Sequence, residues 1–472
     1  MDYTIIMISA GMDKPKKDFN PLNEKNLYLN YGLLGLGTQL SDIGYKVKVF
    51  QGDYKRVKDI FHEINLCNIE IHNLKYPIFI SIPSFFALSW AKKIIDSIKL
   101  ININAKVIVG GRWVVDNNIE WLKTKIKNVD LFVKGYGEKY IEKCLDENKW
   151  VNIDEKLDQQ GINVFSKFDY TILFNYKMYH PCIEVSRGCG RGCKFCVENK
   201  TNPVATKEPK QIIKEAKDII KVYGCNTLNF YFQASIFNPT QEWANEFHKI
   251  YQENDMNFNW RFETRVDSLN KSVLHILSKA GLKVIDLGLE SACEDQLLNM
   301  GKTKNVKMYL EKAKDILEEA YKNNIWTKLN ILLYPGEISE TIDETSKWLN
   351  HNKKYIKGVS VNPLILYRNG DFTYDFIKHI ETLSKIKIDT NRLEENGYMF
   401  IDLSREIDSE LSKKLSLSIS RDFMNIKDYY DLKSICYYPR DAKFKDLVKI
   451  LEKSKYSNEE LPFNLVEDGA EC

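Results

Sequence analysis

Three closely spaced cysteines, Cys189, Cys193 and Cys196, are the residues whose types and spacing most strongly indicate chemistry. They form a CxxxCxxC pattern within SRGCGRGCKFCVENK, directly after an apolar run typical of a β-strand. Thiolates are the natural ligands of iron–sulfur clusters, and a cubane needs four ligands. Three clustered thiolates therefore leave one iron open to a small-molecule ligand.

The residues between the cysteines favour such a cluster. Gly188, Gly190 and Gly192 allow the backbone to curl around it and to offer amide N–H groups to its anionic sulfurs. Arg187 and Arg191 add positive charge, which would help to attract an electron donor or an anionic cofactor.

Two other uses of these cysteines are open. A disulfide with one spare cysteine needs an oxidising compartment, but MDYTIIMISAGMDKPKK lacks the charge pattern of a secretory signal, so we expect a cytoplasmic protein. A zinc site needs a fourth ligand, which His180 or Cys182 could supply. The cluster is favoured because tightly grouped cysteines in a reducing compartment usually serve metal binding or catalysis.

The composition is that of a globular protein without a bias towards polyanions or membranes. Its 472 residues include 68 basic and 65 acidic ones, and this net charge of +3 favours neither nucleic acid nor anionic lipid. At roughly 150 residues per domain the length suggests about three units. The longest uncharged stretch, 76–91, contains prolines and is shorter than the ~20 residues of a membrane span.

The first 150 residues alternate between short apolar strands and helices. The expected strands are DYTIIMIS, YKVKVF, YPIFISI, AKVIVGG and DLFVKG, and the expected helices cover 33–43, 90–100 and 119–125. This α/β alternation predicts a Rossmann-like domain with a parallel sheet. The strand exits then share one edge, where such sheets bind ligands. They are residues 9–11, 81–84, 110–112 and 135–137.

A second run of alternating elements follows a linker at 151–179. The expected strands are CIEVS, LNFYFQ, NWRFETR, VIDLGLE, LNILLY and GVSVNPLI, and the expected helices cover 207–223, 241–254, 271–280, 306–323 and 340–351. Six βα pairs over 180–372 fit a partial (β/α)6 barrel, whose chemistry lies at the C-terminal ends of its strands. Residues 373–472 are charged and mainly helical in pattern, and we expect them to cap the barrel mouth.

The cysteine motif, with Phe195 before its last cysteine, resembles the radical S-adenosylmethionine (SAM) superfamily. WRFETRVDSL, LKVIDLGLESACEDQLLNMGK and LNILLYPGEISETIDET resemble later segments of that family, so the likeness covers about 180–365. It implies that SAM chelates the open iron of a 4Fe–4S cluster and is cleaved by reduction to a 5′-deoxyadenosyl radical. It also implies a flavodoxin- or ferredoxin-type electron donor.

By the same resemblance, five residues contact SAM. Arg265 would bind the carboxylate, Glu290 the ribose hydroxyls, and Phe195 and Leu332 would border the adenine. Many relatives carry an acidic pair on the second strand where this chain has Gln233 and an alanine, although Gln233 can still hydrogen-bond to the SAM amine. Arg265 could instead be only a salt-bridge partner at the barrel rim, and Glu290 could likewise be structural.

The first domain is similar to the cobalamin-binding domain that precedes the radical domain in one large (class B) subgroup. The Asp-x-His-x-x-Gly motif is absent, so the first loop offers no histidine ligand, and the loop 84–86 is the candidate for facing the cobalt. A Rossmann-like domain that binds nothing is the alternative, whereas a dinucleotide site is less consistent with GLLGLGTQL at a helix start. The candidate cobalamin-binding residues are Ser9, Gly11, Ser81, Ser84, Phe85, Gly110, Gly111, Arg112, Gly135 and Glu138.

These observations predict a cobalamin-dependent radical SAM methyltransferase that alkylates an unactivated carbon of a peptide or small natural product, with the peptide slightly favoured. A radical SAM enzyme that binds cobalamin but catalyses a rearrangement or cyclisation is the first alternative. An RNA methylthiotransferase is less consistent, because its N-terminal domain supplies three more cysteines and this one has Cys67 and Cys144 only. Nucleic acid and membrane partners are not expected.

Overall fold

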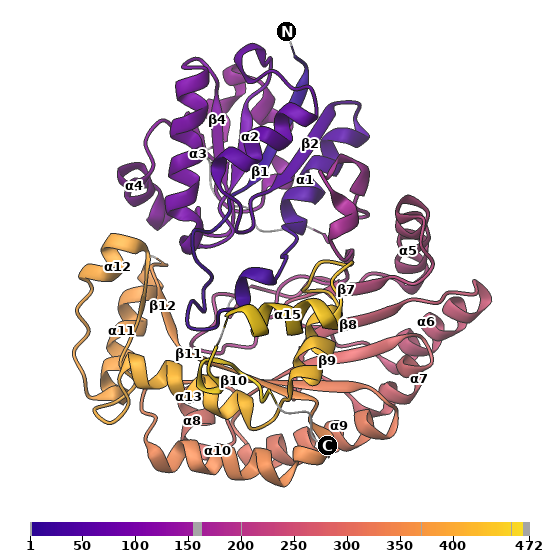
Figure 1. Cartoon of the computed structure of the whole chain (residues 1–472), viewed down its shortest axis with the longest axis vertical. Helices are drawn as coiled ribbons and strands as arrows, with labels where there is room; N and C mark the ends of the chain where they lie inside the picture. Colours follow the sequence, from indigo (N-terminus) through magenta and orange to yellow (C-terminus); the bar gives the residue numbers. More distant parts are fainter. Residues whose placement is uncertain (1, 154–162, 200, 370, 455, 466–472) are drawn as a thin grey trace.

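The computed structural model describes residues 2–153, 163–199, 201–369, 371–454 and 456–465. It contains two parallel sheets, one above the other in Figure 1, with the C-terminal region packed along the second sheet and reaching the first. Among the described residues, no helix is long and apolar enough to cross a membrane.

The first sheet confirms the expected Rossmann-like α/β domain. Its five parallel strands lie in the order β2-β1-β3-β4-β5, and every residue of the central β1 is buried because helices cover both faces. The strands are β1 (Thr4–Ser9), β2 (Lys46–Gln51), β3 (Ile78–Ser81), β4 (Val107–Gly110) and β5 (Leu131–Phe132). The helices are α1 (Tyr31–Asp42), α2 (Val57–Leu66), which the sequence analysis missed, α3 (Leu88–Ile101) and α4 (Asp116–Lys125).

The second sheet confirms the partial barrel. Its six parallel strands lie in chain order from β6 to β11. They are β6 (Cys182–Glu184), β7 (Asn229–Gln233), β8 (Asn259–Arg265), β9 (Leu282–Glu290), β10 (Trp326–Leu333) and β11 (Gly358–Pro363). The helices are α5 (Pro209–Tyr223), α6 (Gln241–Glu253), α7 (Leu274–Ser278), α8 (Glu294–Asn299), α9 (Val306–Lys322) and α10 (Ser339–His351).

Strand β10 shows how the sequence sets the two faces of this barrel. Thr327, Leu329 and Ile331 are buried, whereas the alternate residues Lys328 and Leu332 line a cavity. Side chains alternate between the two faces of a strand, so one set packs on the helices and the other faces the barrel interior.

The C-terminal region is mainly helical, as expected, but it also contains a two-stranded ribbon. GVSVNPLI is not one strand, since β11 ends at Pro363 and a separate strand begins at Ile365. The ribbon pairs β12 (Ile365–Tyr367) antiparallel with β13 (Tyr398–Phe400). The helices are α11 (Asp371–Ser384), α12 (Asn391–Asn396), α13 (Ser409–Arg421), α14 (Ile426–Ser434) and α15 (Phe444–Ser454).

The ribbon also fastens the C-terminal region to the first domain. The Tyr367 and Trp113 rings stack with centroids 4.9 Å apart, and Tyr398 stacks on Phe86 at 3.8 Å. The Trp121 indole donates a hydrogen bond of 2.7 Å to the carbonyl of Glu394.

The predicted linker at 151–179 lies partly outside the described residues, at 154–162. The remainder packs against both sheets: the Tyr170 hydroxyl donates to the Cys182 carbonyl at 3.0 Å, and the Phe174 amide donates to the Val49 carbonyl at 2.9 Å. These contacts hold this part of the segment in place between the two sheets.

The β1–α1 connection, residues 10–30, is the longest departure from the expected pattern. It leaves the first sheet, descends towards the barrel and returns (Figure 1). Leu22 is fully buried among the C-terminal helices, and the Leu27 amide donates to the Tyr437 carbonyl at 2.7 Å. This connection therefore belongs structurally to the barrel side of the molecule.

Candidate functional site

A cavity of about 1070 Å³ lies between the strand ends of the first sheet and the interior of the barrel. Its walls come from the first domain, the cysteine loop, strands β10 and β11, and the C-terminal region. Sites for one small ligand typically occupy about 300–1,000 Å³. This cavity therefore has room for a large ligand.

The first domain supplies a wall of small and neutral polar residues, together with two ion-paired side chains. Most of the candidate cobalamin-binding residues meet there, which the shared edge of the strands predicts. Those that line the cavity are Ser9, Ser81, Ser84, Gly110, Gly111, Arg112, Gly135 and Glu138.

Gly11 and Phe85, also candidates, are not among the residues that line the cavity. A Cβ on Gly11 would lie 2.8 Å from the Asp53 carbonyl oxygen, so this glycine permits close packing of the β1 and β2 ends. Phe85 is 2% exposed and packs on Trp113 and Trp121 beneath the wall. The prediction placed both residues in the correct loops, but a sequence does not show whether a residue of such a loop faces the cavity.

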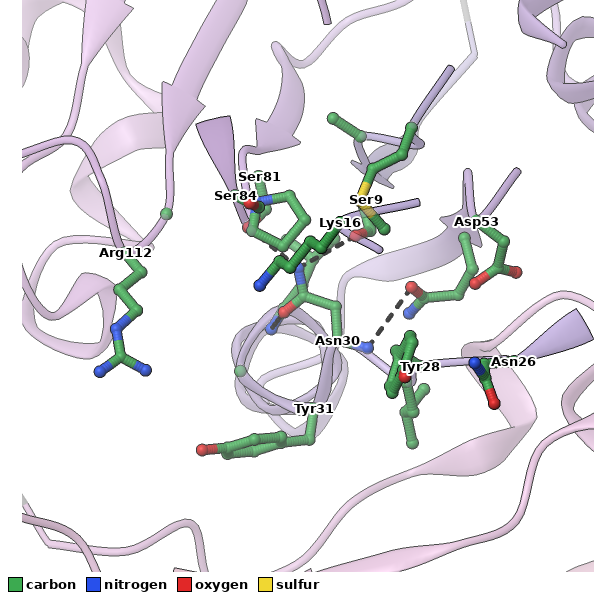
Figure 2. A pocket seen from close by; sticks show the side chains of 18 of the residues that line it. Ser9, Lys16, Asn26, Tyr28, Asn30, Tyr31, Asp53, Ser81, Ser84 and Arg112 are labelled. Atoms are coloured by element: carbon green, nitrogen blue, oxygen red, sulfur yellow. Dashed lines mark hydrogen bonds between the residues drawn. The ribbon is translucent and has the colours of Figure 1, made fainter. Parts of the chain in front are cut away.

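Asn30 organises this wall, and the sequence analysis missed it (Figure 2). Its side-chain amide donates to the Ser9 and Ser81 hydroxyls at 3.1 and 3.0 Å, and its backbone amide donates to Gln51 at 3.4 Å. Its side-chain carbonyl oxygen accepts from the Leu33 amide and caps α1. One residue thus ties the ends of three strands to the start of the first helix.

Lys16, Tyr31 and Asp53 also line the cavity without having been predicted (Figure 2). Asp53 has a left-handed backbone (φ +44°), accepts a hydrogen bond from the Tyr179 hydroxyl, and has its pKa raised to about 6 by burial. For Lys16 the signal available in the sequence was length: a connection of 10–30 far exceeds the usual 4–6 residues, and such loops are usually functional.

The three motif cysteines lie on the loop that follows β6. Cys193 is 6% exposed, and Cys189 and Cys196 are partly exposed. Gly188 has φ +72°, and a Cβ there would lie 2.2 Å from the Asn202 carbonyl oxygen, so the loop requires glycine at this position. The Gly190 amide donates to the Glu198 carbonyl at 3.4 Å rather than being free.

Within the described ranges, no three or more His, Cys, Asp or Glu side chains are grouped as ligands of a single metal ion. A cubane differs from a single ion, because each thiolate binds a separate iron and the sulfurs stand farther apart. The donor set of three thiolates on one glycine-rich loop therefore fits a cluster better than zinc. Cys182, the alternative ligand, is buried in the core and accepts from the Tyr170 hydroxyl at 3.7 Å.

Arg265 ends β8 next to this loop. One guanidinium nitrogen donates to the Cys193 sulfur, and two others bond to the Asp267 carboxylate at 2.8 and 3.0 Å. It also donates to the Lys302 carbonyl at 2.6 Å. The rim salt bridge considered from the sequence is therefore present, and the same side chain also reaches a motif cysteine.

Glu290 ends β9 in a left-handed conformation (φ +69°) at a bulge in its pairing with β10. Its carboxylate pairs with the Lys302 ammonium at 2.9 Å. A strained backbone at a strand end is typical of a functional position. Gly288 leaves room for this pair, because a Cβ there would lie 2.8 Å from a Glu290 carboxylate oxygen.

The other candidate SAM residues lie at the same end of the barrel. Phe195 and Leu332 line the cavity, whereas the three motif cysteines, Gln233, Arg265 and Glu290 are not among its lining residues, and Glu290 lines a smaller pocket beside Ile331 and Leu333. Gln233 ends β7, where its backbone carbonyl accepts from the Val185 amide at 2.9 Å. The structure thus brings the cysteine loop and the ends of β7 to β10 to one rim, as the barrel pattern predicted.

Two ion pairs join the first domain to the cysteine loop. Arg187 pairs with Glu184 and with Glu138 of the first domain, each at 2.6 Å, and Arg112 pairs with Glu198 at 2.8 Å. The charge of Arg187 is therefore neutralised locally and is not displayed to an electron donor, contrary to our expectation.

Comparison with known proteins agrees with this geometry. Residues 183–349 match the family model of the radical SAM superfamily. This part of the chain is therefore a radical SAM domain. No curated protein matches the sequence significantly.

Solved structures extend the likeness to the whole fold. OxsB, described as a cobalamin-dependent S-adenosylmethionine radical enzyme with aqua-cobalamin and S-adenosylmethionine bound, has a TM-score of 0.64 at 14% identity, covering 96% of this chain and 71% of that one. The methyltransferase TsrM from Kitasatospora setae, with cobalamin and a [4Fe-4S] cluster bound, has a TM-score of 0.60 at 15% identity, covering 80% and 75%. The radical SAM chain described here thus has the fold of cobalamin-dependent radical SAM enzymes.

Proposed function

We propose that this chain is a cobalamin-dependent radical SAM methyltransferase acting on an unactivated carbon of a peptide or small natural product. One observation carries the proposal: a single cavity is lined by the glycine- and serine-rich strand ends of the first sheet and by Phe195 of the cysteine loop. A group bound at the strand ends would share one space with Phe195 and Leu332, at the cysteine loop and the end of β10. TsrM and OxsB, which share the fold, bind cobalamin in their solved structures.

The residues present fit the groups assigned to them. Cys189, Cys193 and Cys196 would hold a 4Fe–4S cluster, and Arg265 and Glu290 would bind SAM at its open iron. Together with cobalamin these cofactors would supply one-electron cleavage of SAM and transfer of a methyl group.

The chain itself would position and shield the reactants. The Arg265 guanidinium beside the Cys193 sulfur would offset part of the negative charge of a bound cluster. Asn30 presents hydrogen-bonding groups at the strand ends, and glycines such as Gly110 allow a large ring to approach the backbone. The β1–α1 connection forms part of the cavity wall and would limit the access of water on that side.

The electron would come from a flavodoxin- or ferredoxin-type donor. Arg191 is exposed on the cysteine loop and could contact such an acidic partner. A methylthiotransferase remains less consistent, because Cys144 is buried with its pKa raised to about 12 by burial, which disfavours the thiolate that a second cluster would need.

The test is mass spectrometry of reactions with anaerobically purified protein, cobalamin, SAM, a flavodoxin reducing system and products of neighbouring genes. A substrate that gains one methyl group, with label from methyl-labelled SAM, supports the proposal. Consumption of SAM with an altered but unmethylated product would favour the rearrangement or cyclisation alternative.

A further inference from the structure

The barrel side of the cavity carries a group of three lysines, Lys17, Lys328 and Lys433, here called the lysine chamber. They come from the β1–α1 connection, strand β10 and helix α14, and all three line the cavity. Segments far apart in the sequence therefore converge to place three ammonium groups in one enclosed space.

The chamber contains more basic than acidic side chains. Asp286 pairs with Lys328 at 2.7 Å, but it is also the partner of the fully buried Arg261, at 2.5 Å. Among the described residues, no carboxylate lies within 4 Å of the Lys17 or Lys433 ammonium. Glu263 lies near Asp286. Burial and the Asp286 charge raise the pKa of Glu263, so this carboxyl group balances the charge of the lysines less fully.

The contacts of Lys17 and Lys433 are with neutral groups. Lys17 donates to the Val361 carbonyl at 2.9 Å, and Lys433 lies over the Tyr437 ring at 5.0 Å. Burial and the neighbouring Lys328 lower the pKa of Lys17 to about 7, and burial lowers the pKa of Lys433 well below its usual range. Enclosed cations without anionic partners cost free energy, so a structural role alone does not account for them.

The chamber also stands at a useful distance from the rim where SAM would bind. Lys328 and Leu332 share one face of β10, four residues apart, which is about 13 Å along a strand. Ser360 and Asn362 of the adjacent β11 line the cavity beside them and offer neutral hydrogen-bonding groups. A molecule of metabolite size could thus reach the rim with one end while its other end contacts the lysines.

We propose that the lysine chamber binds the oxyanion, carboxylate or phosphate, of a small anionic substrate and so positions a more distant carbon at the barrel rim. This inference deepens the proposed function and rests on it, because the rim is taken as the place where SAM binds. It also favours a small molecule over a peptide, because the three lysines lie inside the cavity between the β1–α1 connection, β10 and α14.

Anion binding to the anaerobic holoenzyme, loaded with cobalamin and cluster, tests the proposal by isothermal titration calorimetry with inorganic phosphate and with succinate. We compare wild type with Lys433→Met and Lys17→Met. Lys249→Met makes the same change on the exposed face of α6 as a control. Cobalt and iron contents of every variant are measured in parallel.

The proposal expects saturable binding of at least one anion by the wild type and by Lys249→Met, weakened tenfold or more in both chamber variants. The anion that binds distinguishes the phosphate from the carboxylate source. Lys433→Met should unfold at the wild-type temperature or above it, because an enclosed amine without an anionic partner is replaced by an apolar side chain.

Three outcomes overturn it, and a fourth separates it from the proposed function. Absence of binding to the wild type, or wild-type affinity in both chamber variants, would remove the chamber as an anion site. Loss of cobalt in the chamber variants would assign the lysines to the cofactor instead. Wild-type protein without corrin that still binds anions through Lys433 would refute the proposed function and leave the chamber intact.

Discussion

The two sides of the central cavity differ in the chemistry that they present. The strand ends of the first sheet offer glycines, serine hydroxyls and the amide of Asn30, whereas the barrel side offers Lys17, Lys328 and Lys433. A backbone-lined neutral wall suits a large ring edged with amides, and an enclosed excess of cations suits a small anion. The difference indicates that the two sides hold different ligands, with the cysteine loop between them at the rim.

The largest effect is expected from removing the cysteines of the loop that lies between the two sides. Changing Cys189, Cys193 and Cys196 together to Ala should abolish iron binding and the broad absorption near ~400 nm of a thiolate-ligated cluster. Cys182→Ala should keep both, because Cys182 lies in the core with Tyr170. Iron analysis and absorption spectra of anaerobic protein check this, and equal loss in Cys182→Ala would show that the ligands are misassigned.

The neutral wall is tested at Gly110. A Cβ there meets only the Val133 carbonyl oxygen at 3.6 Å, so the protein itself tolerates a side chain, and Gly110→Val should project into the cavity and prevent most corrin binding. Gly110→Ala should have a smaller effect. Gly111 is unsuitable, because its Cβ would lie 2.5 Å from the Ile82 carbonyl oxygen.

Corrin content measured by absorption and cobalt analysis, with circular dichroism to confirm folding, gives the answer. A folded Gly110→Val protein with the full wild-type corrin content would mean that this wall is not the cofactor side of the cavity.

The rim between the two sides is tested at Glu290. Glu290→Gln keeps the shape but loses the charge, and SAM affinity should fall roughly ten- to hundredfold, as when a charge-assisted hydrogen bond is lost. Arg265→Ala should weaken SAM binding too, but it also removes the contact with Cys193, so Glu290→Gln is the cleaner variant. Equilibrium binding of SAM at constant iron content measures both, and unchanged affinity in each would remove these residues from the SAM site.

The smallest effect concerns Asp53, a charged member of the otherwise mostly neutral wall. Burial raises its pKa from 3.8 to about 6, so the native state keeps the proton that the unfolded chain releases, and stability falls as pH rises from about 4 to 6. Asp53→Asn avoids this loss and tolerates the left-handed backbone. We compare the free energy of unfolding of Asp53→Asn with that of wild type at each pH. The difference in favour of the variant should be larger at pH 8 than at pH 4 by on the order of 1–2 kcal/mol.

Thermal unfolding at both pH values measures this gain. Asp255→Asn, at an exposed residue with φ +48°, controls for the backbone effect. An Asp53→Asn gain that is the same at pH 4 and pH 8 would contradict the assignment of the proton to Asp53.

The sequence predicted what depends on local pattern. Alternating strands and helices gave both sheets, and CxxxCxxC gave the loop after β6. The candidate residues that proved to line the cavity, such as Ser81 and Gly110, follow from strand ends sharing an edge.

What could not be predicted depends on contacts between distant segments. Nothing local in DKPKKDFNPLNEKN shows that Lys17 will meet Lys433, more than 400 positions away, or that Leu22 will be buried by C-terminal helices. The direction of Phe85 into the core rather than the cavity depends on Trp113 and Trp121, which a loop motif does not reveal.

The central claim is that one cavity joins a cobalamin side to a radical SAM rim. Its most direct test is the cobalt and iron content of wild-type protein, purified anaerobically from cells supplied with cobalamin. We predict about one cobalt, as corrin, and about four irons per chain. Protein that carries iron and cleaves SAM, yet contains no corrin after such growth, would contradict the claim.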